Sequence, residues 1–362
     1  MDWPNKGLLE TIGMELPIIQ APMAGPVFAD MVVAVSEAGG LGSLPCATMT
    51  AELARSELAR IRESTSRPIN VNFFCHDQPA DEPGRDMAWR RTLEPYYREF
   101  GLDPQAPFAS SSRNPFDDEF CGLVEEFRPE VVSFHFGLPS RRLVDRVKST
   151  GAKVFSSATT VEEARWLELR GCDAVIAQGF EAGGHRGNFL VTDMATQVGT
   201  LALVPQVVDA VRVPVISAGG IADARGIVAA LALGASAVQI GTAYLFTPEA
   251  RLTTPHRKAL RDKRAEETAL TNVFTGRPAR GILNRVMREL GPMSSDAPSF
   301  PLAGGALAPL RAATEKSVSG DFMSLWSGQA ARLCRERPAG ELTRQLAADA
   351  QGLLARMGER RE

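Results

Sequence analysis

Cysteine is scarce in this sequence and follows no pattern. The chain of 362 residues has five cysteines with no CxxC pair and no Cys/His spacing, namely Cys46, Cys75, Cys121, Cys172 and Cys334. An odd number of widely separated thiols is typical of reduced cysteines in a cytosolic protein. The sequence therefore predicts no metal site, no disulfide framework and a cytoplasmic location.

An excess of charge of one sign and long apolar runs are lacking as well. The 40 Lys and Arg nearly balance the 43 Asp and Glu, and the formal net charge of −3 offers no attraction to nucleic acid or to an anionic membrane. No apolar run approaches the roughly 18 residues of a membrane span. The first residues, MDWPNKGLLE, lack the basic and apolar regions of a secretion signal. We expect neither nucleic acid nor a membrane as a partner.

Short apolar runs that end in Gly, Pro or Asn recur along the chain, and segments with helical spacing separate most of them. This alternation is typical of βα units, and one of the predicted helices is Val161–Leu169 with Thr160 as its N-cap. The runs are Ile18–Met23, Leu41–Pro45, Ile69–Phe74, Val131–Gly137, Lys153–Ala158, Ala174–Gly179, Pro214–Gly220 and Ala237–Thr242. They predict the α/β class and a closed (β/α)8 TIM barrel. A doubly wound sheet would normally carry G-x-G-x-x-G after its first strand, and this sequence does not.

Two proline-rich segments of little periodicity interrupt the repeating unit. Loops of this length inside a compact protein are usually lids or binding lobes, so we predict a smaller substrate-binding cap domain formed by insertions over the barrel mouth. Helical spacing at Phe322–Arg335 and Glu341–Met357 predicts a return to the barrel. The predicted units are a barrel of residues 1–75 and 131–247, helices of 320–362 packed back on it, and a cap of 76–130 and 248–319.

A glycine-lined loop with one histidine follows the sixth run, in AVIAQGFEAGGHRGN (174–188). In parallel barrels the chemistry gathers where strands end. Gly183, Gly184 and Gly187 have no Cβ, so the backbone there can approach a flat ligand closely. His185 faces that ligand in this interpretation. The alternative is a loop histidine bonded to backbone.

Paired small residues end the seventh and eighth runs. Gly219-Gly220 precedes a helix, and Gly241-Thr242 closes the last strand. Exposed N–H groups at such turns bind phosphate together with the helix dipole, and barrels commonly place a phosphate site after strands seven and eight. Gly219-Gly220 alone is equally consistent with a tight βα turn.

Four amide side chains lie at otherwise apolar strand ends and would ring one mouth of a barrel. They are Gln20, Asn72, Gln178 and Gln239. An amide offers an acceptor and two donors, which suits the polar edge of a heterocycle such as the pyrimidine end of a flavin. Each amide could equally bond to neighbouring backbone.

Several blocks together resemble those of the nitronate monooxygenase family, also called 2-nitropropane dioxygenases. They are IIQAPMAGP, NVNFFCH, VVSFHFGLP, AQGFEAGGHRG, PVISAGGIADARG and AVQIGTAYL, within residues 15–245. LWSGQA (325–330) resembles the family's C-terminal helix. The resemblance implies a barrel that binds FMN. It also implies a flavoprotein that oxidises alkyl nitronates with O₂ to carbonyl compounds and nitrite, with neutral nitroalkanes as further candidate substrates. Detoxification of nitro compounds is a role consistent with this activity.

Matching positions carry the family's site residues onto this chain. The resemblance implies His185 as the catalytic residue, and His135 and Phe300 near the substrate. The positions implied for the cofactor are Ala21, Pro22, Met23, Asn72, Gln178, Gly183, Gly184, Ala218, Gly219, Gly220, Gln239, Ile240, Gly241 and Thr242. Members commonly have tyrosines from about position 300 onwards, whereas this chain has only Tyr96, Tyr97 and Tyr244. We expect a monomer or homodimer whose partners are a small nitronate or nitroalkane and O₂.

Two other functions fit the same residues. One is an NADH- or NADPH-dependent FMN reductase that acts on a quinone or an enoyl thioester, and the other is a flavin-binding protein without catalysis. An imidazole with a pKa near 6.5 suits proton abstraction next to a nitro group, which favours an enzyme with His185 as base or as the residue that orients a nitronate. A phosphate-binding aldolase or isomerase would need a lysine or paired carboxylates at strand ends, and these are lacking.

Overall fold

The predicted closed barrel is confirmed by the computed structural model, which describes residues 3–80, 82–107 and 113–359. Its parallel strands are β1 (Ile18–Gln20), β2 (Gly42–Pro45), β3 (Ile69–Phe74), β4 (Val131–His135), β5 (Lys153–Ala158), β6 (Ala174–Gln178), β8 (Val215–Ala218) and β9 (Ala237–Ile240). They follow the order β1-β9-β8-β6-β5-β4-β3-β2, and a bridge between Ile19 and Leu41 joins β1 to β2. Each strand matches one of the eight apolar runs.

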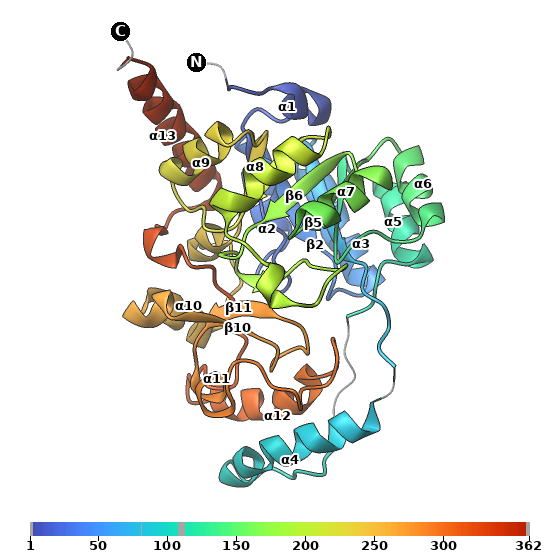
Figure 1. Cartoon of the computed structure of the whole chain (residues 1–362), viewed down its shortest axis with the longest axis vertical. Coiled ribbons are helices and arrows are strands. Elements are labelled where there is room, and N and C mark those ends of the chain that lie inside the picture. The colour runs from blue at the N-terminus through green and yellow to red at the C-terminus, as the bar shows by residue number, and fades with distance from the viewer. Residues whose placement is uncertain (1–2, 81, 108–112, 360–362) are drawn as a thin grey trace.

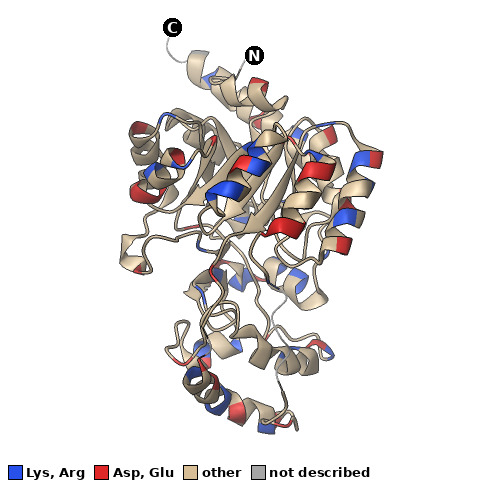
Figure 2. Cartoon of the chain, turned by 90° about the vertical axis from the view of Figure 1, so that its right-hand side faces the viewer, with Lys and Arg blue, Asp and Glu red and all other residues tan. Residues whose placement is uncertain are grey.

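Helices surround the strands on the outside of the barrel (Figure 1). They are α2 (Ala29–Glu37), α3 (Ala51–Ser64), α5 (Asp118–Phe127), α6 (Arg141–Ser149), α7 (Val161–Leu169), α8 (Thr200–Ala210), α9 (Ala224–Ala232) and α13 (Ala339–Glu359). α13 packs against α9 and α2 and so completes the ring. A short helix, α1 (Gly7–Ile12), lies at the end of the barrel away from the smaller lobe. Lys, Arg, Asp and Glu residues recur along the outer helices (Figure 2), whereas the strands contribute to an apolar core.

The helix α7 shows how local sequence sets an element. Thr160 precedes it with extended backbone, and its side-chain oxygen accepts a hydrogen bond from the N–H of Glu163 at 3.2 Å. Such a cap satisfies one of the free N–H groups of the first turn. The predicted helix Val161–Leu169 with Thr160 as N-cap is therefore confirmed.

A second, smaller lobe lies below the barrel in Figure 1. It contains α4 (Pro83–Glu99), α10 (Thr254–Arg261), α11 (Arg285–Leu290) and α12 (Gly304–Glu315), with strands β10 (Thr268–Thr271) and β11 (Ala279–Ile282). It has its own apolar core, in which Trp89 and Leu93 of α4 pack with Leu307 and Leu310 of α12. By contrast, α5 packs against α3 and α6, so this part of segment 76–130 lies in the helical layer of the barrel and not over its mouth.

The predicted helix over Phe322–Arg335 is wrong. The chain there is irregular apart from a 3₁₀ turn at Ala331–Leu333, and Trp326 forms a bridge with Gly281 of β11. The other 3₁₀ turns are Met194–Thr196, Thr242–Phe246 and Lys263–Glu266. The apolar residues of this segment contact two different surfaces and not one side of a helix: Phe322 packs in the core of the small lobe, and Ala331 packs beside Leu245 and Leu260.

We predict that Trp89→Ala destabilises the small lobe. Trp89 is fully buried, and its indole N–H donates to the carbonyl of Ala303 at 3.1 Å. Removing such a side chain lowers the free energy of unfolding by about 3 to 5 kcal/mol. Urea unfolding followed by circular dichroism measures the change. Met87→Ala, on the same helix at a side chain that is 61% exposed, is the control and should unfold like the wild type. Equal midpoints for Trp89→Ala and Met87→Ala would contradict the separate core.

Candidate functional site

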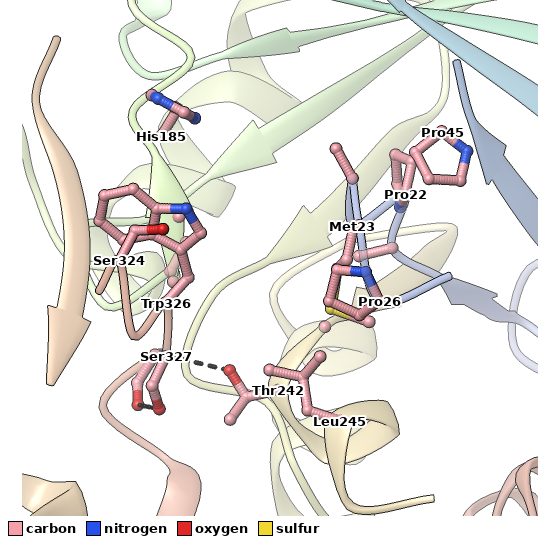
Figure 3. A pocket seen from close by; sticks show the side chains of 18 of the residues that line it. Pro22, Met23, Pro26, Pro45, His185, Thr242, Leu245, Ser324, Trp326 and Ser327 are labelled. Atoms are coloured by element: carbon pink, nitrogen blue, oxygen red, sulfur yellow. Dashed lines mark hydrogen bonds between the residues drawn. The ribbon is translucent and has the colours of Figure 1, made fainter. Parts of the chain in front are cut away.

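A cavity of about 660 Å³ lies between the carboxyl ends of the barrel strands and the small lobe. Figure 3 shows Pro22, Met23 and Pro26 on one side of it, and His185 and Trp326 on the other. The predicted site residues on its lining are Ala21, Pro22, Met23, Asn72, His135, Gln178, Gly183, Gly184, His185, Ala218, Gly219, Gly220, Gln239, Gly241 and Thr242. Residues from separate strand ends thus meet around one cavity.

Two of the predicted site residues do not line this cavity. Ile240 is fully buried in the barrel core. Successive side chains of a strand point to opposite faces, so Gln239 and Ile240 cannot both face the cavity. The side chain of Ile240 therefore points into the barrel core, and the cofactor role of Ile240 stays a prediction. Phe300 is nearly buried behind His185, with its ring centroid 5.3 Å from the imidazole.

The irregular segment 325–330 crosses the barrel mouth and supplies part of the cavity wall. Trp326, Ser327 and Gly328 line it, and the Gly328 N–H donates to Thr242 Oγ1 at 2.9 Å. Backbone of this segment approaches Gly183 so closely that a Cβ there would lie 2.5 Å from the Gly328 nitrogen. The block LWSGQA (325–330) marked this segment in the sequence, but the spacing of its apolar residues indicated a helix.

The four amides have different roles. Gln20 is buried and bonds to backbone, since its Oε1 accepts from Ser43 N–H at 2.9 Å. Gln178 donates to the His185 carbonyl at 3.0 Å and accepts from Gly187 N–H at 2.8 Å. Asn72 lines the cavity and donates to Ser133 Oγ at 2.9 Å. Gln239 differs because its Oε1 is buried at the cavity without a hydrogen-bond partner in the described part of the chain.

His185 lies on a short strand, not in a free loop. β7 (Gly184–His185) pairs with β11, so that His185 is opposite Ala279 in a three-stranded sheet of order β10-β11-β7. Its Nε2 lies 3.0 Å from Thr275 Oγ1. No pattern in the sequence indicates Thr275, because the residues around it do not have the spacing of a motif. The small lobe therefore holds both the backbone and the ring of His185.

Aromatic rings and positive charge surround the imidazole of His185. The ring of Trp326 lies 5.6 Å away and that of Phe74 6.1 Å away, centroid to centroid. Burial lowers the pKa of His185 well below its usual range, and the charges of Arg113 and Arg277 lower it further. The ring is therefore neutral at pH 7 and faces a site that attracts anions.

His135 supports the backbone of His185. Its Nδ1 lies 2.9 Å from Ser157 Oγ, and its Nε2 lies 3.3 Å from the His185 carbonyl oxygen. Burial lowers the pKa of His135 to about 3, with a smaller contribution from Arg277. A neutral ring can donate from Nε2 while it accepts at Nδ1. His135 thus lines the cavity and also fixes the strand that carries His185.

Arg186 is buried, so an exposed pair with Glu181 is excluded. Its guanidinium donates to the carbonyls of Gly179 and Gln178 at 2.6 and 2.8 Å and to Gln197 Oε1 at 2.9 Å. Burial lowers the pKa of Arg186 to about 10. Glu181 instead accepts from Thr200 N–H, at the start of α8. Arg186 therefore cross-links the end of β6 to the segment after β7.

The small residues after β8 and β9 form one end of the cavity. Gly219 and Gly220 have φ angles of 109° and 70°, which residues other than glycine rarely adopt. Asp223 caps α9 by accepting from Arg225 N–H at 2.9 Å. The helix terminus is thus already occupied by a carboxylate, and the turn at Gly219-Gly220 and the Thr242 hydroxyl are what the cavity presents to an anion.

The residues from position 300 onwards place no tyrosine at the cavity. Tyr96 and Tyr97 pack in the core of the small lobe, and the hydroxyl of Tyr244 lies 2.7 Å from Thr343 Oγ1 in the barrel. Arg311 and Glu315 of α12 line the cavity instead. Within the described residues, no helix has the length and apolar character that a membrane crossing requires.

Comparisons with known proteins extend over nearly the whole chain. A family model described as nitronate monooxygenase matches residues 5–349. A nitronate monooxygenase of Pseudomonas aeruginosa is 43% identical over 343 residues, which cover 94% of this chain and 98% of that protein. The structure of a nitroalkane oxidase from Streptomyces ansochromogenes is similar with a TM-score of 0.87 and 40% identity, over 96% of this chain and 99% of that one. FabK from Thermotoga maritima is similar with a TM-score of 0.74 and 26% identity, over 99% of each chain.

We predict that His256 makes stability depend on pH. His256 lines the cavity, its Nε2 lies 3.0 Å from the Trp326 carbonyl oxygen, and burial lowers its pKa to about 4. In the unfolded chain its pKa is near 6.5, so between pH 6.5 and 4 only the unfolded state is protonated. The stability due to neutral His256 is therefore lost as the pH falls through this window, by about 2 kcal/mol between pH 6.5 and 5.

Urea midpoints of the wild type and of His256→Gln at pH 7 and pH 5 measure this effect. Glutamine can still donate to the Trp326 carbonyl but does not titrate, so its midpoint should fall less between the two pH values. An equal fall in both proteins would show that His256 is not the titrating group.

Proposed function

The chain belongs to the nitronate monooxygenase family, and we propose that it is an FMN-dependent enzyme that oxidises alkyl nitronates with O₂ to carbonyl compounds and nitrite. The observation that carries this proposal is the position of the His185 imidazole at the cavity wall, close to Arg113 and Arg277, whose positive charges together with burial hold its pKa below the usual range. An anionic nitronate is attracted to such a site, because opposite charge acts more strongly in a buried cavity than in water.

The residues of the cavity fit a flavin. Gln239 Oε1 is a buried acceptor that a donor on the ligand would satisfy. Gly183 leaves no room for a side chain where the strap of residues 325–330 meets β7. Gly219, Gly220 and Thr242 would hold the phosphate, and Gln239 and Asn72 the ring system. FMN supplies the electron transfer and the reaction with O₂ when it is bound.

The residues of the protein bind and orient the substrate, and one of them accepts a proton from it. A neutral nitroalkane must lose a proton from the carbon next to the nitro group, and we assign this proton transfer to the neutral imidazole of His185 on the cavity lining. A preformed nitronate needs no such step. Because burial makes the imidazole a weak base, we propose that the nitronate is the better substrate of the two.

We propose that the small lobe is the substrate-binding cap. It covers the barrel mouth with Arg311 and Glu315 of α12 and with the segment 325–330. The aromatic rings of Phe74 and Trp326 keep the space beside His185 apolar, which excludes water from the reacting carbon.

Anaerobic stopped-flow mixing tests the reaction class. The holoenzyme is mixed with ethyl nitronate or with NADH, and the flavin absorbance is followed. We expect a rapid change with the nitronate and none with NADH. Rapid bleaching by NADH alone would identify the reductase alternative, and a protein that binds no flavin would exclude both functions.

The variant His185→Asn tests the proposed base. We expect kcat/KM for nitroethane to fall by about 10² to 10⁴, the usual contribution of a general base. Turnover of ethyl nitronate by the same variant should change much less, which makes it an internal control for folding and flavin content. Equal losses on both substrates would contradict a role in proton abstraction.

The variant Gln239→Leu tests the flavin contact. We expect weaker FMN binding by about tenfold or more, because a hydrogen bond of about 1.5 kcal/mol is lost. The apoprotein should not lose stability, because its buried unpaired acceptor is removed. FMN titration and thermal unfolding measure both effects, with Gln206→Leu, at an exposed site on α8, as the matched control. A destabilised apoprotein with unchanged FMN affinity would contradict the assignment.

A further inference from the structure

Thr275 is a buried residue of the turn between β10 and β11, and it lies behind His185. Its side chain is 2% exposed, and its Oγ1 lies 3.0 Å from His185 Nε2. The same hydroxyl is oriented to donate to the Arg277 carbonyl at 3.4 Å. Because β11 also pairs with β7, one small sheet holds both the histidine and its hydroxyl partner.

Two arrangements of protons are compatible with these distances. In one, His185 Nε2–H donates to Thr275, whose hydroxyl donates to the Arg277 carbonyl, so each donor has an acceptor. In the other, the Thr275 hydroxyl donates to Nε2, so that it no longer donates to the Arg277 carbonyl, and an N–H on Nδ1 faces the cavity. The first arrangement keeps both hydrogen bonds of the Thr275 hydroxyl and is therefore favoured.

We propose that Thr275 is a positioning residue that holds His185 in the Nε2–H tautomer and leaves the Nδ1 lone pair as the proton acceptor. The proposal rests on the proposed function for the reaction that uses this lone pair. The C–H bond next to the nitro group breaks, its electron pair stays on the nitronate, and the proton forms the Nδ1–H bond of an imidazolium. No oxidant or second reactant takes part in this step.

Loss of the Thr275 hydroxyl should therefore affect the turnover of a neutral nitroalkane more than that of a nitronate. Loss of the Thr275 hydroxyl lets His185 populate the tautomer with Nδ1 protonated, and this form cannot accept the proton of a neutral nitroalkane. A preformed nitronate has no proton to transfer, so its turnover depends little on the tautomer. A merely structural role of Thr275 would affect both substrates alike.

Nitrogen NMR of the holoenzyme labelled with ¹⁵N-histidine tests the tautomer directly. The chain has four histidines, and the spectrum of His185→Gln assigns the signals of His185 by their disappearance. We expect the His185 signals of a protonated Nε2 and an unprotonated Nδ1. The opposite pattern would overturn the proposal, whatever the enzyme turns over.

Three variants then test the role of the hydroxyl. Thr275→Val removes it at nearly constant volume, and we expect a mixed tautomer and a loss of about tenfold or more in kcat/KM for nitroethane, since a wrong tautomer disables a catalytic histidine. Ethyl nitronate should lose less than about threefold. Thr275→Ser should restore both the tautomer and the activity on nitroethane.

Thr271→Val is the matched control, because Thr271 is a buried threonine of β10 whose hydroxyl accepts from Val273 N–H and does not contact His185. It should leave the His185 tautomer and the ratio of the two substrates unchanged. Equal losses on both substrates in Thr275→Val, with an unchanged tautomer, would overturn the proposal. An Nε2–H tautomer that depends on Thr275, in a protein that oxidises neither substrate, would instead refute only the proposed function.

Discussion

The pairing of β7 with β11 is the constraint on which the site depends. Only two residues of β7 take part, and His185 is one of them, opposite Ala279. This pairing joins the barrel, which supplies the strand ends, to the small lobe, which supplies Thr275 and the strap of residues 325–330. The side chain of His185 is thereby fixed relative to the cavity floor. A rigid support of this kind places a reacting group more accurately than a free loop does.

Behind β7, a buried polar network holds the backbone in place. Arg186 donates to the end of β6 and to Gln197, whose Nε2 donates to Thr159 Oγ1 at 2.9 Å. The same threonine donates to Glu163, which also accepts from the N–H of Phe189. Burial of charge is unfavourable unless hydrogen bonds compensate it, and here each charged group has several. The residues that follow His185, Arg186 to Asn188, are therefore buried and held by hydrogen bonds.

Local patterns in the sequence predicted the barrel well. Eight apolar runs became eight strands, and Thr160 and α7 were placed correctly, because strand periodicity and N-capping depend on neighbours in the chain. The prediction of a helix over Phe322–Arg335 was wrong, because the apolar residues of this segment contact separate cores and do not form one side of a helix. The burial of Arg186 could not be predicted, because an arginine is rarely fully buried and its acceptors here are mostly main-chain carbonyls that no sequence pattern reveals.

The sequence by itself determined that glycines and a histidine follow the sixth barrel strand, and that amides stand at four strand ends. Those features come from residue type and position along one strand. Only the tertiary structure decided that Gln178 bonds to the backbone of His185 while Gln239 keeps a free acceptor, and that Thr275 lies against the imidazole. His185 and Thr275 are 90 residues apart in the chain, and their contact exists because a strand of the small lobe pairs with the strand that carries the histidine.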